Sequence, residues 1–306
     1  ADYPDMSSAI LNKYIRPEVL SQLTRFKLDP RQLVEGNLAG AHKSPFHGFA
    51  VEFASHREYV AGDDLRHLDW KVYFRHERHV IKQYEMETNL NCHLILDVSA
   101  SMRYGEEDQQ KLLYSSQIAT TLAYLVVEQS DRVSLTTFDN KTRGYLPPSN
   151  NMGQIIRMTE SLDQVKSINK TNIAKTLGEV SAKIGRRSIV VVISDFFVEI
   201  EDLKDALQRL RYDNHEVVLM HVMHQDELRF DMDGMIRFIG LEDPDQLLTR
   251  PHDIRDAYLE AVEKFMVDFQ KLCDANRCEY VLCDTSKDLG VTFAQYLQQR
   301  SQAGRL

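Results

Sequence analysis

From about residue 90 onward, short apolar runs alternate with segments whose apolar residues recur at helical spacing. The runs with the character of buried strands lie at 94–96, 133–138, 189–193, 217–222 and 280–282. Between them, segments such as 112–126, 173–184, 203–210 and 257–272 place apolar side chains on one helical face. Continuous apolar strands separated by helices are typical of a parallel sheet covered on both faces. The pattern therefore predicts an α/β fold with a doubly wound, mostly parallel sheet.

The first 89 residues follow a different pattern. A helix is expected at 20–34, followed by a stretch of small residues that includes Gly36 and Gly40. Two strand-like pieces come next, at 49–53 and 80–84. We therefore expect residues 1–89 to form an N-terminal extension of helix and β-strand, and residues 90–306 to form the sheet domain.

Composition and charge narrow the class of protein. Of the 306 residues, 43% are hydrophobic and 27% are charged, a balance that excludes collagen-like, low-complexity and disordered chains. Lys and Arg number 37 against 46 Asp and Glu, and the resulting net charge of −9 argues against nucleic acid as a partner. The longest aliphatic run, 189–193, is too short to span a membrane. The 4 cysteines form no paired framework, so we expect a cytoplasmic protein.

The most specific local signal is a D-x-S-x-S run directly after the first strand of the sheet domain. Its carboxylate and two hydroxyls stand at alternate positions of a loop, where all three can face one point. A threonine that opens a later helix and an aspartate that follows the strand 189–193 extend the set, because ligands of such sheets bind beyond the carboxyl ends of the strands. Oxygen ligands of this kind suit Mg²⁺, with Mn²⁺ or Ca²⁺ as alternatives. The predicted metal-site residues are Asp97, Ser99, Ser101, Thr171 and Asp195.

This set resembles the metal-ion-dependent adhesion site of von Willebrand factor A domains, over roughly residues 90–300. The resemblance implies a Rossmann-type fold in which Ser99, Ser101 and Thr171 ligate the metal directly or through water. It implies that the two aspartates act mostly through water and that an acidic residue of a partner fills the open coordination position. One departure is visible: Phe196 follows the last aspartate, where that family often has glycine.

A longer block lies upstream, in residues 51–59, 62–71 and 82–87, and leads into the D-x-S-x-S run. Together they resemble the family called domain of unknown function 58, and the match includes the only tryptophan of the chain. The resemblance implies a von Willebrand factor A-like core with an N-terminal extension. It also implies a MoxR-type AAA+ ATPase as partner, since members are commonly encoded beside such ATPases.

Basic and acidic side chains interleave in this upstream block. One interpretation is a salt-bridged network that fixes the extension against the core, in which each exposed pair contributes about 0–1 kcal/mol. The other is a docking surface for a partner. Trp70 is expected to be a buried anchor of the network, with an exposed contact residue as the alternative. The residues of this candidate network or docking surface are Arg57, Asp63, Asp64, Arg66, Asp69 and Trp70.

Three functions are compatible with these features. The first is a non-enzymatic adaptor that presents the metal to an acidic side chain of a protein partner. The second is a metal-dependent phosphoester hydrolase that uses metal-bound water, for which the sequence offers Arg103 and Lys170 as cations near the strand ends. The third is a structural module with a vestigial metal site. The chain has no phosphate-binding Gly-x-x-x-x-Gly-Lys loop, and Ser99 has no histidine nearby in the sequence. We favour the adaptor and expect no catalytic residues.

Overall fold

The computed structural model describes residues 10–23, 26, 28, 51–60, 69–76, 78–86, 90–165, 169–185, 187–242 and 246–303. The chain divides into two compact units: residues 1–37 together with 90–306, and residues 38–89. The sequence placed a single boundary at residue 89, whereas the structure groups the N-terminal helix α2 (Pro17–Leu23) with the sheet domain. The reason is packing, because Val19 and Leu23 are buried in the same apolar cluster as Phe293 of the C-terminal helix α11 (Leu289–Ala303).

The helix expected at 20–34 is shorter and begins earlier. Helix α2 starts at Pro17, a residue favoured in the first turn because it lacks the N–H that would remain unpaired there. The helix ends at Leu23, and Phe26 is not helical. Residues 29–34 of the expected helix lie outside the described part of the chain.

The larger unit is built on a six-stranded sheet, and this confirms the predicted α/β class. The strands lie in the order β10-β7-β6-β3-β4-β5, and all neighbours are parallel except the pair of β4 and β5. The antiparallel edge strand β5 was not predicted, because its side chains alternate between half-buried and exposed and form no continuous apolar run. The bounds are β3 (Asn91–Asp97), β4 (Arg132–Phe138), β5 (Thr142–Ser149), β6 (Ile189–Ser194), β7 (Glu216–Met223) and β10 (Glu279–Asp284).

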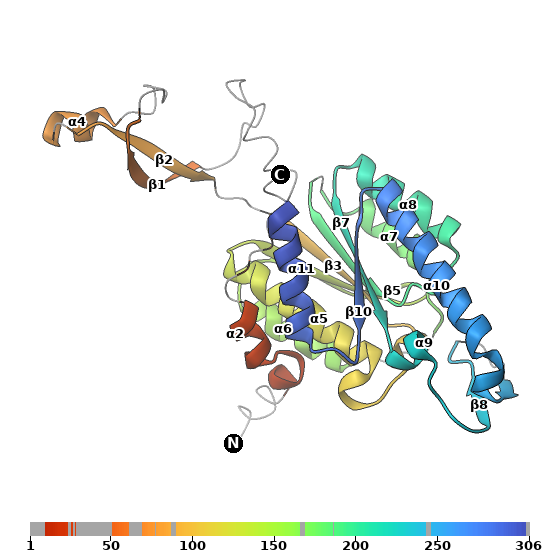
Figure 1. Cartoon of the computed structure of the whole chain (residues 1–306). Coiled ribbons are helices and arrows are strands. Elements are labelled where there is room, and N and C mark those ends of the chain that lie inside the picture. Colours follow the sequence, from red (N-terminus) through yellow and green to blue (C-terminus); the bar gives the residue numbers. More distant parts are fainter. Residues whose placement is uncertain are drawn as a thin grey trace, which may run out of the picture. The chain divides into compact units, whose positions relative to one another are not determined.

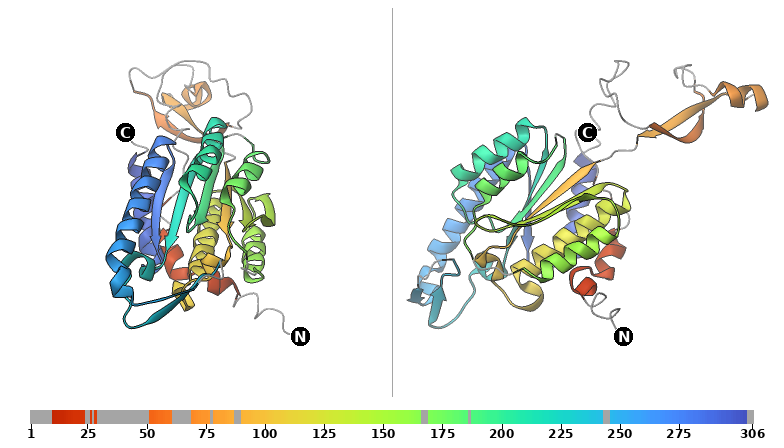
Figure 2. Two further views of the ribbon diagram at one scale, coloured as in Figure 1. Left: turned by 90° about the vertical axis from the view of Figure 1, so that its right-hand side faces the viewer. Right: turned by 180° about the vertical axis from the view of Figure 1, so that it is seen from behind.

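Helices cover both faces of the sheet, as the doubly wound prediction requires (Figures 1 and 2). On one face lie α5 (Lys111–Glu128), α6 (Gly153–Asp163), α2 and α11; on the other lie α7 (Ile173–Ser181), α8 (Ile200–Tyr212) and α10 (Pro251–Ala275). Successive strand residues point to opposite faces. Accordingly, Leu94 and Leu96 belong to the apolar cluster beneath α5, while Ile95 belongs to the cluster beneath α7 and α8.

The carboxyl ends of the parallel strands share one edge of the sheet, the lower edge in Figure 1. Two short 3₁₀ helices, η2 (Ala100–Arg103) and η3 (Glu107–Gln109), connect β3 to α5 there. After β7 come helix α9 (Gln225–Arg229) and an antiparallel hairpin of β8 (Ile236–Ile239) and β9 (Gln246–Thr249). Because β3 and β6 are neighbours, the residues that follow them meet at this edge.

Residues 38–89 contain an antiparallel pair of strands, β1 (Val51–Glu58) and β2 (Val80–Met86), and the short helix α4 (Trp70–His76). Asp69 caps α4, since its Oδ1 accepts hydrogen bonds from the backbone N–H groups of Lys71 (2.9 Å) and Val72 (3.3 Å).

The expectation that Trp70 is a buried anchor was wrong, because its side chain is 52% exposed. Its ring packs edge-on against Tyr73 of the same helix. Of the other members of the candidate network, the Arg57 side chain and residues Asp63, Asp64 and Arg66 lie outside the described part of the structure. Among the described helices, none combines the length and apolar character needed to cross a bilayer.

Candidate metal site

Asp97, the last residue of β3, is the centre of the candidate site. Its side chain is fully buried, and its carboxylate accepts three hydrogen bonds. Oδ1 accepts from the backbone N–H of Ser99 at 2.9 Å. Oδ2 accepts from the hydroxyls of Thr171 at 3.0 Å and Ser194 at 2.6 Å. Asp97 thus joins the loop after β3 to the start of α7 and to the end of β6.

The two serines of the D-x-S-x-S loop lie together above Asp97. The hydroxyl oxygens of Ser99 and Ser101 are 3.1 Å apart; Ser99 is buried, whereas Ser101 is partly exposed. The end of β4 and the segment before α7 hold this loop in place, because the N–H of Val98 donates to the carbonyl of Phe138 and that of Ala100 to the carbonyl of Asn169. The structure therefore gathers the predicted hydroxyls on one side of the sheet edge.

Asp195, which follows β6, is also fully buried. Its Oδ2 accepts a hydrogen bond from Lys111, but its Oδ1 has no hydrogen-bond partner among the described residues. Burial and, secondly, the negative charge of Asp195 raise the pKa of Asp97 to about 7. The two aspartates are therefore close enough to repel each other strongly. All five predicted residues come together at this edge.

Phe196 follows Asp195 at the position where von Willebrand factor A domains often have glycine, and its backbone conformation shows how it takes that place. Phe196 adopts a φ of +50°, a conformation that glycine favours because it has no Cβ. The aromatic side chain compensates, since it is fully buried and packs against Phe269 with 5.0 Å between ring centroids. The turn that positions Asp195 is thus retained without a glycine.

Two further residues belong to the site and were not predicted. Ser194 donates its hydroxyl proton to Asp97 and accepts the N–H of Phe196 at 3.0 Å. Lys111, at the start of α5, is only 1% exposed, and its Nζ lies 2.8 Å from both Asp195 Oδ2 and Glu227 Oε1. Burial lowers the pKa of Lys111, but the charges of the two carboxylates outweigh it and raise that pKa above its ordinary value.

Glu227 of helix α9 is the second carboxylate that contacts Lys111, and hydrogen bonds at the N-terminus of this helix hold it in place. The backbone N–H of His224 donates to Glu227 Oε2 at 2.8 Å, and the His224 ring accepts from the backbone N–H of Asp226. This reciprocal arrangement is a capping box. Because it holds the Glu227 carboxylate in one orientation, it also fixes the position of the Lys111 ammonium beside Asp195.

The donor set of the site is rich in hydroxyls. In the described part of the chain, no three His, Cys, Asp or Glu side chains are grouped so as to hold a metal ion by themselves. The serine and threonine hydroxyls and the two aspartates offer the hard oxygen ligands that Mg²⁺ prefers, and Oδ1 of Asp195 has no partner among the described residues. An unpaired buried carboxylate oxygen is costly unless a donor or cation meets it, so these residues fit a bound cation.

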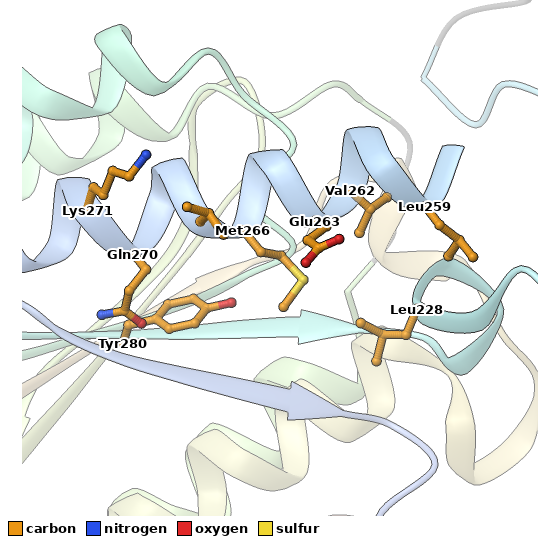
Figure 3. Close-up of a pocket in the computed structure, with 9 residues that line it drawn as sticks. Leu228, Leu259, Val262, Glu263, Met266, Gln270, Lys271 and Tyr280 are labelled. Carbon is orange, nitrogen blue, oxygen red and sulfur yellow. The ribbon is translucent and has the colours of Figure 1, made fainter. Parts of the chain in front are cut away.

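A separate groove of about 570 Å³ lies along α10 (Figure 3). Its wall is mostly apolar, and Leu228 of α9 lies at one end while Tyr280 of β10 lies toward the other. The Tyr280 hydroxyl is 2.9 Å from Nδ1 of the buried His221. No sequence pattern predicted this groove, since its lining comes from three elements far apart along the chain.

Comparisons with known proteins place this chain among relatives of unknown function. The chain is 22% identical, over 86% of its length, to uncharacterized proteins of Mycobacterium tuberculosis and Mycobacterium bovis, and the match covers 80% of each relative. Among solved structures, it is similar to a conserved hypothetical protein, BatB, from Bacteroides thetaiotaomicron (14% identity, TM-score 0.46, 70% of this chain and 99% of that one). The VWA domain of SpRpn10 is another neighbour (9% identity, TM-score 0.40, 66% of this chain and 92% of that one).

The sequence pattern of one protein family covers more than half of the chain. The family described as protein of unknown function DUF58 matches residues 55–266. The matched segment includes β3, α5 and β6, which carry most of the site. The resemblance seen in the upstream block and the D-x-S-x-S run is thereby confirmed, and the chain belongs to the DUF58 family.

Proposed function

We propose that this chain is a non-enzymatic protein-binding module that presents a Mg²⁺ ion to an acidic side chain of a protein partner. The observation that supports the proposal most directly is the buried Oδ1 of Asp195, which has no hydrogen-bond partner among the described residues. It lies at the edge of the sheet where the hydroxyls of Ser99, Ser101 and Thr171 gather around Asp97. Mn²⁺ or Ca²⁺ would suit the same oxygen ligands.

The proposed roles follow from where each residue lies. The hydroxyls of Ser99, Ser101 and Thr171 would hold the ion, and Asp97 and Asp195 would balance its charge. When bound, the ion supplies a positive centre that attracts a carboxylate. Residues 91–306 contain 25 Lys and Arg against 33 Asp and Glu, so their surplus of eight negative charges draws cations toward the domain.

For the partner we propose a MoxR-type AAA+ ATPase. The support is the DUF58 membership of the chain together with the resemblance on which the sequence-based expectation was built. A metal bridge of this kind makes and breaks no covalent bond. The module would therefore act by holding its partner in place.

The alternative of a metal-dependent hydrolase has weaker support. Besides the metal, transfer of a phosphoryl group usually uses a cationic side chain directed at the substrate. Lys111 is the buried cation seen at this site, but its ammonium is bound to Asp195 and Glu227. Turnover of phosphoesters that requires Mg²⁺ would favour the hydrolase over the adaptor.

The test combines metal binding with partner binding. We expect Mg²⁺ to produce a binding isotherm in calorimetry with the wild-type chain and none with Asp97→Ala. A purified MoxR-type ATPase should co-elute with the wild type, lose this co-elution on chelation, and fail to bind Asp97→Ala. The matched control is Asp205→Ala, an exposed aspartate of α8, which should behave as the wild type.

Two results would contradict the proposal. Equal co-elution of the ATPase with the wild type and Asp97→Ala would exclude a metal bridge. A folded wild type that binds neither Mg²⁺ nor Mn²⁺ would indicate the third alternative, a structural module with a vestigial site.

A further inference from the structure

A carboxylate from the β8–β9 hairpin reaches the candidate metal site. Glu242 lies between β8 and β9 in the chain, and β8 lies on the side of the molecule where the parallel strands end (Figure 1). Its Oε1 is buried, and none of the described residues forms a hydrogen bond with it. Glu242 was not a candidate in the sequence, because more than 40 residues separate it from Asp195 and it belongs to no motif.

The neighbours of Glu242 are the predicted metal-site residues. Burial and, next, the negative charge of Asp195 raise the pKa of Glu242, whereas the hydroxyl and N–H of Ser101 and the N–H of Thr171 lower it. The carboxyl group thus faces the same hydroxyl-bearing loops that surround Asp97. Both Glu242 Oε1 and Asp195 Oδ1 are buried acceptors that lack a donor in the described part of the chain.

Two buried carboxylate oxygens that lack donors among the described residues, in side chains whose charges repel each other, are unfavourable without a positive charge. Lys111 does not serve both, because its ammonium contacts Oδ2 of Asp195 and the carboxylate of Glu227. A divalent cation among Asp195, Ser101 and Glu242 would satisfy both oxygens at once. The geometry therefore favours Glu242 as a carboxylate ligand from within the chain.

We propose that Glu242 completes the metal site by occupying the coordination position otherwise open to an acidic residue of a partner. This inference rests on the proposed function, since it needs the metal, and it adds a regulatory step. With Glu242 in place the site is self-occupied. A partner carboxylate must displace the Glu242 carboxylate before it reaches the ion.

The test uses Mn²⁺ as the metal and compares the full-length wild type with Glu242→Gln. Calorimetry measures affinity, and the relaxation of water protons by Mn²⁺ counts the water molecules directly bound to the ion. We expect Glu242→Gln to bind Mn²⁺ about tenfold more weakly or worse, because a charged ligand is lost. The bound ion should gain one water. A purely electrostatic influence would change the affinity but not the water count.

A matched control and a rescue make the experiment specific. Asp233→Asn removes an exposed carboxylate close to the same hairpin and should leave both quantities as in the wild type. Acetate should restore Mn²⁺ affinity and displace the extra water in Glu242→Ala, where the position is vacant. Acetate should have no effect on the wild type. Heat unfolding followed by circular dichroism confirms that each variant is folded, and Glu242→Ala with its acetate rescue carries the test if Glu242→Gln does not fold.

The outcomes separate this inference from the function on which it rests. If the wild type binds Mn²⁺ and Glu242→Gln shows the same affinity and water count, Glu242 is not a ligand and the adaptor proposal stands. If acetate displaces a water from the Mn²⁺-bound wild type, the position is open and the inference is overturned. If the folded wild type binds no Mn²⁺, the proposed metal function itself fails.

Discussion

The Nζ atom of Lys111 lies 2.8 Å from Oδ2 of Asp195, and the two side chains are 1% and 0% exposed. Because of this buried pair, the two carboxylate oxygens of Asp195 have different surroundings. One oxygen is paired with a cation that belongs to the chain, and the other has no partner among the described residues. The ammonium also reduces the net negative charge of the site, so it limits how strongly the site attracts an external ion.

Replacing Lys111 by methionine should lower the free energy of unfolding by about 3–5 kcal/mol, because it leaves Asp195 and Glu227 as uncompensated buried charges. Urea unfolding measures the loss. The double variant Lys111→Met/Asp195→Asn should lose less free energy of unfolding than the single variant, because only one of the two uncompensated buried charges remains.

The control for this prediction is Lys204→Met on α8. Lys204 forms an exposed pair with Glu201 at 3.3 Å, and its loss should cost at most about 1 kcal/mol. If Lys111→Met is no more destabilising than Lys204→Met, the buried pair does not stabilise the fold.

Ser194→Ala should destabilise the chain by about 1–3 kcal/mol, because both Asp97 Oδ2 and the N–H of Phe196 lose a buried partner. The variant should also bind Mg²⁺ more weakly, since Asp97 is less firmly oriented. Urea unfolding and calorimetry measure the two effects. Ser301→Ala, at an exposed position of α11, serves as the control, and equal stability of the two variants would contradict the prediction.

His93 should make stability depend on pH. Burial and, to a lesser degree, the nearby charge of His215 lower the pKa of His93 to about 4, from an ordinary value of 6.5. Between these values the unfolded chain binds a proton that the folded chain does not. The free energy of unfolding therefore falls as pH decreases from 6.5 to 4, by at most about 1.4 kcal/mol per pH unit from this group.

Urea unfolding of the wild type and His93→Gln across this pH range isolates the contribution. The variant should show a shallower loss of stability, while His252→Gln, at an exposed position of α10, should follow the wild type. Identical slopes for the wild type and His93→Gln would show that His93 titrates normally.

Tryptophan fluorescence should report an exposed ring. Trp70 is the only tryptophan of the chain, and it is 52% exposed on α4. We expect acrylamide to quench its emission to an extent approaching that of free N-acetyltryptophanamide, because the quencher reaches the ring from solvent. A quenching constant typical of a buried indole would contradict the structure. Protection from quenching on addition of a partner would place that partner on residues 38–89.

The sheet could be predicted largely because its central strands are buried on both faces. Residues 189–193 are aliphatic without interruption, and all of them are buried in β6. Strand β5 lies at the edge of the sheet, has one solvent-exposed face and contains two prolines, so its sequence resembles that of a loop. The length of the N-terminal helix was misjudged for a related reason: apolar spacing shows where a helix can form, but packing decides where it ends.

The residues of the candidate site also fall into those that local pattern predicts and those that only packing reveals. Asp97, Ser99 and Ser101 lie within five residues, and the strand-end rule brought Asp195 to them, so local pattern and topology sufficed. Lys111 and Glu242 reach the site from positions that carry no motif. The Lys111–Asp195 contact joins residues 84 apart, and composition does not show which lysine of a helix turns inward.

The pairing of Val51 with Met86 changes what residues 38–89 are. Their chain enters and leaves through two adjacent strand ends, while the residues before and after them build one core. They therefore form a separate compact unit that lies, along the chain, between two segments of the sheet domain. Replacing residues 51–86 by a short flexible loop should therefore leave that core able to fold, and a different hairpin in the same place should not require the domain to be rebuilt.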